Sequence, residues 1–505
     1  MDIGLDLGTA GCRAALYDAE GRVVARADRG YRLLVPHPGW AEQDADEVVA
    51  TAVDVLRDLV ARLPPGIRPR VLGLSSVLHS VLPLDRERRA LAPAITWADT
   101  RSAPQAERLR AQCDPTALYH ATGCPLHPLY WPAKLQWLRE HRPDVYRRAR
   151  WFVSLKEHLL QRLCGRVAVD LSVASGTGLL DLRAKRWHPA ALDLAGIREE
   201  HLSALVEPTT IVGEILPAIA EATGLPRGLP VVVGAADGPL ASLGSGALGP
   251  GRMAATIGTS GAVRVVLREP RTDQQARTWC YYLAEEWWVA GAAINNGGIV
   301  YRWVRDHLFD WPDAPDGEDR RYAVMDALAE GVPPGSDGLL FLPFLAGERA
   351  PRWNADARGA LLGLTLHHTR GHVVRATLEG VAFRMRSIAD ALEEAAGPPT
   401  EVRASGSFSR SRVWVQILAD VLGRELLIPA VSDATAFGAA FLARRAVGDV
   451  DGLEEVRASC PIVEAFAPNP ATRERYESLY RWYRDAYAAL QGTFAALAAF
   501  QRTRA

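Results

Sequence analysis

The chain has 505 residues, of which 48% are hydrophobic and 23% are charged. A chain of this length is too long for one hydrophobic core, so we expect two or three domains. Lysine and arginine number 58 against 59 acidic residues, a formal net charge of −1, which favours neither a nucleic acid nor an anionic membrane surface as a partner.

The cysteines and the start of the chain indicate a cytoplasmic protein. The six cysteines lie far apart, without a CxxC pair or a zinc-type histidine spacing, which is typical of free thiols in a reducing compartment. An acid at position 2 and the lack of a basic start argue against a signal peptide. No apolar run approaches the roughly 20 residues that a membrane-spanning helix needs.

A β-hairpin is predicted at the start of the chain, in MDIGLDLGTAGCRAALYDAEGRVV. An apolar run contains Asp6 and ends at a GTAG turn, after which a second apolar run follows. GRVVARADRGYRLL predicts a third strand. ADEVVATAVDVLRDLVARL predicts a helix that stops before Pro64 and Pro65.

The same pattern recurs half a chain later, in ATIGTSGAVRVVL, so that the turn Gly8–Gly11 corresponds to the turn Gly258–Gly261. RTWCYYLAEEWWVAGAAI then predicts two strands joined at Glu285 and Glu286, and VWVQILADVLGRELL predicts a helix. Both halves therefore predict an α/β domain. VVVGAADGPLASLGSG would supply the last strand of the first half and a glycine-rich crossing, which divides the chain into domains 1–243 and 244–505.

Two glycine turns of this kind suit a polyphosphate, because backbone N–H groups can approach its oxygens closely. A carboxylate beside such a turn would repel phosphate unless a cation stood between them, so Asp6 predicts a bound Mg²⁺. Ordinary hairpin turns are the alternative. The sequence contains neither a Walker loop nor a GxGxxG motif that opens a helix.

Three histidines, His367, His368 and His372, cluster in LTLHHTRGHVVRATLEG. His368 and His372 are spaced i, i+4 and could share a helix face. No Asp, Glu or Cys nearby in the sequence completes a set of metal ligands. The pattern therefore favours the start of a helix over a metal site.

These motifs resemble the FGGY family of carbohydrate kinases, within the actin, Hsp70 and sugar kinase superfamily, over nearly the whole chain. DLGT and IGTSG resemble the two phosphate hairpins, and KLQWLREH resembles a first-domain helix near the sugar. GERAPRWNADARGALLGLTLHHTRGHVVRATLEGVAF resembles the signature region, and SGSFSRSRVWVQILADVLGRELLIP with ATAFGAAFLA resembles the adenosine segment. The resemblance implies two ribonuclease H-like α/β domains with a catalytic cleft between them, and ATP and Mg²⁺ as cofactors.

Within the family, seven stretches are most similar to gluconate kinases: LHSVLPLD, TWADTRS, SLKEHLL, DLSVASGTGLLDL, GAADGPLASLGSG, GTSGAVR and AAINNGGIVYRW. They imply phosphorylation of a sugar or sugar acid, with D-gluconate converted to 6-phosphogluconate as the leading expectation. A xylulose, other pentulose or polyol kinase stays open. Two alternatives of other classes also stay open. One is an ATPase of the actin or Hsp70 kind that acts through a protein partner, and the other is a regulator that binds sugar without turnover.

Asp237, in VVVGAADGP, is the predicted catalytic base that accepts the proton of the attacking hydroxyl. An aspartate that only starts a turn before Pro239 is the alternative. Many family members have a glycine immediately before this acid, where this chain has Ala236.

The resemblance assigns the ATP and metal ligands along both halves. Asp6 is the residue expected to organise Mg²⁺. Arg13 is expected to bind phosphate, but it could equally be a surface strand residue. Ser407 replaces a glycine often seen in the adenosine loop, which leaves the nucleotide preference open. The expected nucleotide ligands are Thr9, Gly11, Arg13, Gly258, Thr259, Gly298, Arg302, Gly406 and Arg410.

The small-molecule substrate is expected in the first half, next to the catalytic acid. Taken alone, His79 and Trp97 would be more typical of a hydrophobic core. Lys156 or Arg264 is expected to pair with the carboxylate of a sugar acid. The C-terminal helix in YESLYRWYRDAYAALQGTFAALAAF could pack on its own domain or form a homodimer. The expected substrate residues are His79, Trp97, Asp99, Lys156 and Asp237.

Overall fold

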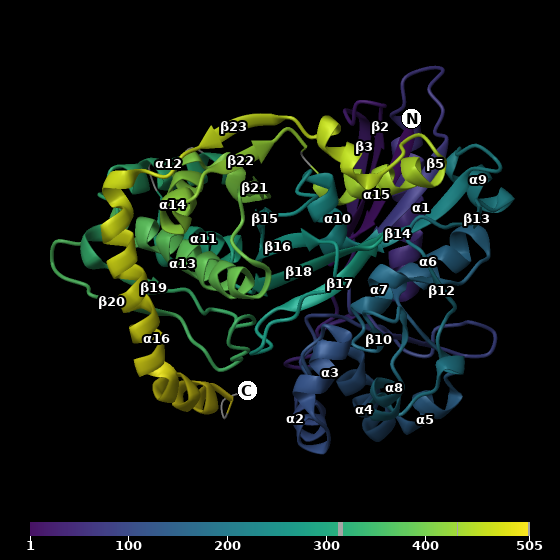
Figure 1. Cartoon of the computed structure of the whole chain (residues 1–505), viewed down its shortest axis with the longest axis horizontal. Helices are drawn as coiled ribbons and strands as arrows, with labels where there is room; N and C mark the ends of the chain where they lie inside the picture. The colour runs from purple at the N-terminus through teal and green to yellow at the C-terminus, as the bar shows by residue number, and fades with distance from the viewer. Residues whose placement is uncertain (312–316, 432, 503–505) are drawn as a thin grey trace.

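Two mixed sheets organise the two halves of the chain in the computed structural model, which describes residues 1–311, 317–431 and 433–502 (Figure 1). β1 pairs antiparallel with β2 and parallel with β5, so the predicted hairpin lies in the middle of the first sheet. In sheet order the six strands are β13 (Ile211–Glu214), β14 (Pro230–Ala236), β5 (Val71–Ser76), β1 (Asp2–Leu7), β2 (Gly11–Tyr17) and β3 (Val23–Gly30).

The second sheet repeats this order, with one strand more. β15 pairs antiparallel with β16 and parallel with β21, as β1 pairs with β2 and β5. The predicted two-domain ribonuclease H-like α/β fold is therefore confirmed. In sheet order the seven strands are β17 (Trp279–Ala284), β18 (Trp287–Ile294), β16 (Gly261–Leu267), β15 (Arg252–Ile257), β21 (Glu401–Ser405), β22 (Leu426–Pro429) and β23 (Ile462–Phe466).

Helices cover both faces of the first sheet, which is why all six residues of β1 are buried. α1 lies against β2 and β3, whereas α15, from the second half of the chain, lies against β1 and β5. Two glycines permit this close approach. An added Cβ would lie 1.8 Å from the Ala436 carbonyl oxygen at Gly4 and 2.1 Å from that of Ala439 at Gly73.

The glycine-rich crossing between the two halves begins as a helix. α10 begins at Asp237, directly after β14, and buries Leu240 and Leu243. Its glycines allow helices to pack closely instead of forming turns, since an added Cβ at Gly244 would lie 1.8 Å from the Ala434 carbonyl oxygen. The domain division near residue 243 falls within α10 and stays a prediction.

The remaining elements connect the two sheets. The helices of the first half are α1 (Ala45–Ala61), α2 (Ala103–Gln112), α3 (Pro115–Thr122), α4 (Trp131–His141), α5 (Pro143–Arg148), α6 (Leu155–Cys164), α7 (Leu171–Ser175), α8 (Pro189–Ala195), α9 (Pro217–Thr223) and α10 (Asp237–Gly244). Those of the second half are α11 (Gly298–Trp303), α12 (Glu318–Glu330), α13 (Arg370–Ala396), α14 (Arg412–Leu422), α15 (Ala434–Ala446) and α16 (Arg473–Arg502).

Shorter elements complete the chain. Two-stranded pairs are formed by β4 (Glu42–Gln43) with β7 (Ala94–Ile95), β6 (Leu82–Leu84) with β8 (Trp151–Val153), β9 (Val169–Asp170) with β12 (Leu205–Val206), β10 (Leu180–Asp181) with β11 (Arg186–Trp187), and β19 (Leu340–Leu342) with β20 (Ala360–Leu362). The short helical turns are η1 (Glu199–His201), η2 (Val304–Leu308), η3 (Ser336–Gly338), η4 (Ser407–Arg410), η5 (Leu453–Ser459) and η6 (Pro470–Thr472).

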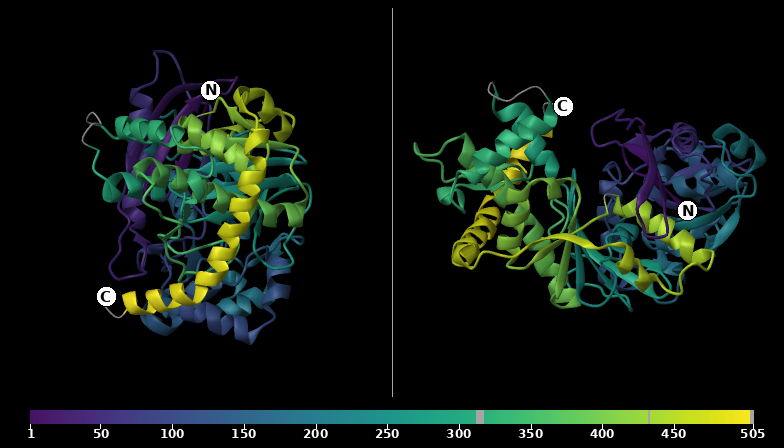
Figure 2. Two further views of the ribbon diagram at one scale, coloured as in Figure 1. Left: turned by 90° about the vertical axis from the view of Figure 1, so that its left-hand side faces the viewer. Right: turned by 90° about the horizontal axis from the view of Figure 1, so that it is seen from above.

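The long helix α16 runs along the outer side of the second half (Figure 2). Its aromatic face packs on its own domain. Tyr480 and Tyr483 lie beside Phe383 of α13, and Tyr487 lies 5.1 Å from Phe344 between ring centroids. Of the two packing arrangements predicted for this helix, the structure therefore shows the one within the chain.

Two expectations from the sequence concern the cysteines and membrane-spanning helices. The six cysteines are all free thiols. Over the described ranges 1–311, 317–431 and 433–502, the helices include none with both the length and the apolar character needed to cross a membrane.

Candidate active site

Asp6 lies buried in β1, two residues before the first glycine turn begins at Gly8. The strand register places Arg13 opposite Asp6 on one side and Ser75 beside it on the other. Ser75 Oγ donates a hydrogen bond to Asp6 Oδ1 at 2.7 Å, and Arg13 Nη2 lies 3.7 Å from Asp6 Oδ2. Gly8 N–H donates to the Gly11 carbonyl oxygen at 2.9 Å and closes the turn.

The carboxyl of Asp6 is in an environment that disfavours its charge. Burial, together with the nearby carboxylates of Asp433 and Asp237, raises the pKa of Asp6 to about 7, although Arg13 and Ser75 act in the opposite direction. Arg13 also reaches Asp433, with 3.6 Å between Nη1 and Oδ2. A divalent cation would stabilise this group of acids, so the donor set fits the predicted Mg²⁺.

The second glycine turn lies against the start of α11. Gly258 N–H donates to the Ser260 carbonyl oxygen at 2.9 Å, and Gly298 N–H donates to the Gly258 carbonyl oxygen at 2.7 Å. Ile299 N–H donates to the Thr259 carbonyl oxygen at 3.1 Å. A Cβ at Gly298 would lie 2.6 Å from the Gly258 carbonyl oxygen, so glycine is needed for this contact.

A cavity of about 460 Å³ opens beside α11, and we call it the α11 cavity. It brings together Gly298, Arg302 and Arg410, which are three of the predicted nucleotide ligands from distant parts of the sequence. A further predicted nucleotide ligand, Gly406, precedes the lining residue Ser407 and has a φ of 102°. The other lining residues are Tyr301, Asp319, Tyr322, Ala323, Asp326, Phe408, Ser411 and Trp414.

A second cavity of about 180 Å³ lies between the two halves, and we call it the interdomain cavity. Asp237, at the first position of α10, faces it together with Thr9 and Ser260 from the two glycine turns. Burial raises the pKa of Asp237, whereas Arg264 and Arg349 lower it. The other lining residues are Val77, Leu78, His79, Trp97, Gly238, Ala262, Trp279, Tyr281 and Ala293.

His79 and Trp97 are held in fixed positions at this cavity. His79 has a φ of 70°, a strained conformation for a residue with a Cβ. Its Nδ1 lies 2.6 Å from the Gly176 carbonyl oxygen, which can only accept, so Nδ1 carries the proton and Nε2 is left as an acceptor. Trp97 Nε1 donates to Thr9 Oγ1 at 2.7 Å. The tryptophan thus links the first glycine turn to the cavity.

The comparison with family models decides what this pair of cavities belongs to. Residues 1–244 match the N-terminal domain, and residues 253–447 the C-terminal domain, of the FGGY family of carbohydrate kinases. The chain belongs to the FGGY family of carbohydrate kinases. This FGGY kinase is therefore an enzyme that transfers a phosphoryl group to a sugar-like hydroxyl compound, and the expected resemblance is confirmed.

Full-length relatives of this FGGY kinase have two different substrates in their names. It is 36% identical to a gluconokinase of Bacillus licheniformis, over 99% of this chain and 98% of that protein. Its structure is similar to a gluconate kinase from Lactobacillus acidophilus, with a TM-score of 0.92, 30% identity and coverage of 98% and 99% of the two chains. A ligand-bound xylulose kinase from Lactobacillus acidophilus has a TM-score of 0.91 with the same identity and coverages.

Two predicted substrate residues lie outside the interdomain cavity of this FGGY kinase. Asp99 Oδ2 accepts the Ala41 N–H at 2.6 Å and pairs with Arg101, also at 2.6 Å. Lys156 is buried and its Nζ lies 2.6 Å from Asp170 Oδ2. Each side chain is thus engaged by an internal partner, and of the two cations predicted for a substrate carboxylate only Arg264 reaches the cavity.

Sequence reasoning missed two charged residues of the FGGY kinase site. Arg349 lies in the GERAP stretch of the signature region, which was recognised without a role for this arginine, and its guanidinium lies 5.3 Å from the Trp97 ring centroid. Asp433 caps α15, where Oδ1 accepts the Ala436 N–H at 3.2 Å. An aspartate immediately before an apolar helix signals a cap, but the meeting of Asp433 with Arg13 depends on the fold.

Proposed function

We propose that this kinase transfers the terminal phosphoryl group of ATP to a hydroxyl of a sugar acid, with D-gluconate as substrate and 6-phosphogluconate as product. The observation that carries the substrate is the charge of the interdomain cavity. Its lining contains one carboxylate, Asp237, and two guanidinium groups, Arg264 and Arg349. A sugar-acid carboxylate would balance the second arginine, whereas a neutral sugar would leave it uncompensated.

The other groups of the cavity add no negative charge to this balance. Burial lowers the pKa of His79 well below its usual range, so the imidazole is neutral. The Nε atoms of Arg264 and Arg349 are buried and have no hydrogen-bond acceptor within the described part of the chain. Buried donors of this kind favour a bound acceptor. The gluconokinase and gluconate kinase among the relatives support the same substrate.

In the proposed reaction Asp237 accepts the proton of the attacking hydroxyl as the phosphoryl group arrives. Arg264 and Arg349 favour the ionised form of Asp237, which burial disfavours. His79 Nε2 can accept a hydrogen bond from another hydroxyl, and the Trp97 ring offers an apolar wall. These contacts orient the sugar acid and leave one hydroxyl for Asp237.

ATP is proposed to occupy the α11 cavity, with its phosphates along the two glycine turns. Gly258 contacts Gly298 at the α11 cavity, and Ser260 of the same turn lines the interdomain cavity, so the second turn connects the two cavities. Asp6, with Asp433 near it, would hold Mg²⁺, which offsets charge on the phosphates. The proposed phosphate ligands are Thr9, Gly11, Arg13, Gly258 and Thr259.

Release of ADP by the purified chain with Mg·ATP tests this proposal, with D-gluconate, D-xylulose, L-ribulose and glycerol compared at equal concentration. Turnover led by D-gluconate is expected, and Asp237→Asn should lower kcat roughly 100-fold or more. Turnover led by D-xylulose would replace the substrate but keep the kinase, and the xylulose kinase structure of equal identity makes this the second candidate. ATP hydrolysis independent of every sugar would overturn both.

A further inference from the structure

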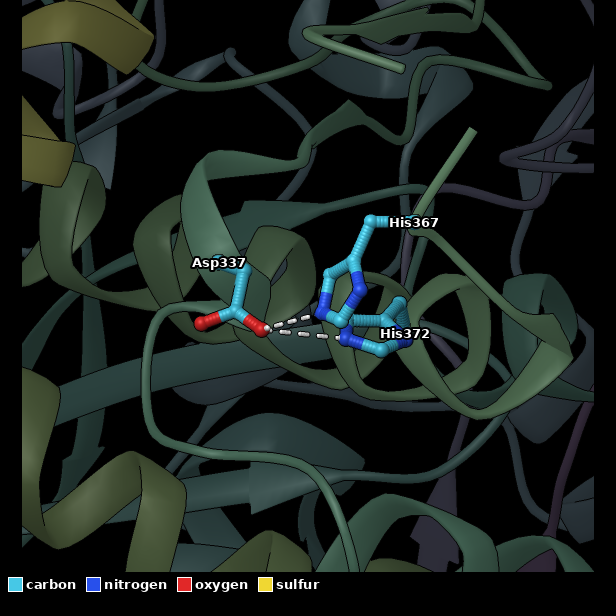
Figure 3. A group of neighbouring side chains, drawn as sticks. All are labelled: Asp337, His367 and His372. Carbon is cyan, nitrogen blue, oxygen red and sulfur yellow. Dashed lines mark hydrogen bonds and ion pairs between the residues drawn. The ribbon is translucent and has the colours of Figure 1, made fainter. Parts of the chain in front are cut away.

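A cluster of two histidines and one aspartate lies at the start of α13, and neither cavity includes any of the three among its lining residues. Figure 3 shows Asp337 and His367 converging on His372, all with their polar ends toward one point. Asp337 belongs to η3, whereas His367 precedes α13 and His372 lies in its first turn. The sequence places Asp337 30 residues before the nearer histidine, which is why no acid seemed to complete the set.

We propose that Asp337, His367 and His372 form a binding site for a divalent transition metal ion, with Zn²⁺ as the principal candidate. Asp337 Oδ2 lies 3.2 Å from His372 Nε2 and 3.4 Å from His367 Nε2, and all three ligand atoms lie within 4.8 Å of one another. Ligands at zinc bond lengths in a tetrahedron are about 3.4 Å apart. The two nitrogen–oxygen spacings therefore already match, and the two histidine nitrogens are within 4.8 Å of one another.

The set has the chemistry of a transition-metal site with one open position. Two imidazoles and a carboxylate suit Zn²⁺ or its Co²⁺ and Ni²⁺ analogues, whereas Mg²⁺ prefers oxygen ligands. Asp337 Oδ2 faces both imidazoles, so one carboxylate oxygen and two ring nitrogens converge on the same space. With three protein ligands, a water molecule or an external group would occupy the fourth position.

Two of the three ligands are already held in place. The loop that carries Asp337 is tied to α13, because Gly335 N–H and Ser336 Oγ donate to the Glu379 carboxylate at 2.7 and 2.8 Å. His372 is 8% exposed and its Nδ1 contacts Thr369 at the helix cap. His367 is 73% exposed, so its ring is free of the packing that would prevent it from closing on an ion.

Metal binding also defines the protonation of His372. In the metal-free state its Nδ1 accepts the Thr369 N–H at 3.1 Å, so Nε2 carries the proton and donates to Asp337. A metal takes the Nε2 lone pair, and the proton of the neutral imidazole then sits on Nδ1. Thr369 Oγ1, 3.0 Å from Nδ1, can accept it, and the Thr369 N–H gives up its hydrogen bond to Nδ1. The ring therefore changes tautomer without net release of a proton.

A bound ion would join the η3 loop to the start of α13 and so stabilise the second half. The metal-free chain, prepared with a chelator and then desalted, is titrated with CoCl₂ in excess Mg²⁺, which occupies oxygen-ligand sites. We expect one Co²⁺ per chain, a visible absorption band of the tetrahedral kind that Zn²⁺ displaces, and a melting temperature raised by about 2 °C or more with Zn²⁺.

Two variants and a control identify the ligands. His367→Ala, at a mostly exposed position, and Asp337→Asn should each lower the affinity for Co²⁺ at least 10-fold and remove the band. His120→Ala, at an exposed histidine outside the cluster, should leave both unchanged, and all variants should retain kinase turnover in Mg²⁺. Absence of stoichiometric Co²⁺ binding by the wild type, or binding that survives both ligand substitutions, would show that the cluster is only a hydrogen-bonded group.

Discussion

Arg264 and Arg349 both face Asp237, so their removal separates the binding of an acid from the binding of a neutral sugar. Arg349→Gln is expected to lower kcat/KM for D-gluconate roughly 10- to 100-fold, because a hydrogen bond to a charged group contributes about 1.5–3 kcal/mol. The loss for D-xylulose should be several-fold smaller. Steady-state kinetics with both substrates measures the difference.

Lys156→Met is the contrasting variant for this prediction. Lys156 pairs with Asp170 away from the cavity, so its removal leaves a buried acid unpaired. Stability and the rates with both substrates should then fall together. Selective loss of D-gluconate turnover in Lys156→Met, with none in Arg349→Gln, would return the carboxylate partner to Lys156.

The raised pKa of Asp6 predicts a pH dependence for binding of the magnesium nucleotide. Below pH 7 the carboxyl is increasingly protonated, because its pKa is about 7 in the metal-free protein. Mg²⁺ needs the ionised form, so the affinity for Mg·ADP should rise with pH up to about 7 and level off above it. Calorimetric titrations from pH 5.5 to 8.5 measure this, and Asp6→Asn should remove the rise.

The raised pKa of Asp6 also makes the stability of the folded chain depend on pH. The direction is opposite to that for an acid whose pKa is lowered by a salt bridge. Between the ordinary pKa of 3.8 and about 7, the folded chain binds more protons at Asp6 than the unfolded chain. The contribution of Asp6 to stability therefore falls as pH rises through this range in the absence of metal. A flat Mg·ADP affinity across pH 6 to 8 would mean that Asp6 stays ionised without the ion.

At the scale of elements, the position of Asp237 depends on how closely α10 packs on α15. A Cβ at Gly438 would lie 2.4 Å from the Leu240 carbonyl oxygen, which is rigid backbone. Gly438→Ala should therefore cost about 1–3 kcal/mol and also lower kcat, because α10 begins with Asp237, the proposed catalytic base. Thermal unfolding and turnover of the variant are the measurements.

Gly492→Ala in α16 is the matched control for Gly438→Ala. Nothing lies within 4 Å of an added Cβ at Gly492, so the better helix propensity of alanine should stabilise the chain by up to about 1 kcal/mol. Turnover should not change. Equal effects of the two substitutions on the melting temperature would contradict the argument from close packing.

At the scale of the whole molecule, the repeat of the glycine turns was enough to predict two similar α/β domains. Local patterns placed both hairpins and the helices α1 and α14, because alternation and caps are properties of short segments. The approach of Arg349 to Trp97, and of Asp337 to the histidines, was beyond such patterns. Each joins segments far apart in the chain, and only the folded sheets bring them together.

The two halves already touch, at α15 on the first sheet and at β17, and these contacts indicate how they move. The Tyr130 and Tyr281 hydroxyls are 2.9 Å apart, and β17 of the second half packs against α7 of the first. The interdomain cavity is lined from both halves, whereas all residues of the α11 cavity belong to the second. We therefore expect the halves to close about these contacts when sugar acid and nucleotide are both bound, excluding water from the phosphoryl group.

Small-angle scattering on Asp237→Asn tests closure, because this variant should hold D-gluconate and Mg·ATP together without turnover. The radius of gyration should decrease most with both ligands, and should change little with nucleotide alone, because all residues of the α11 cavity belong to the second half. The wild type should accordingly hydrolyse ATP slowly without sugar. An unchanged radius with both ligands bound, with binding confirmed by calorimetry, would mean that the halves already have their catalytic arrangement and that water is excluded by the substrate itself.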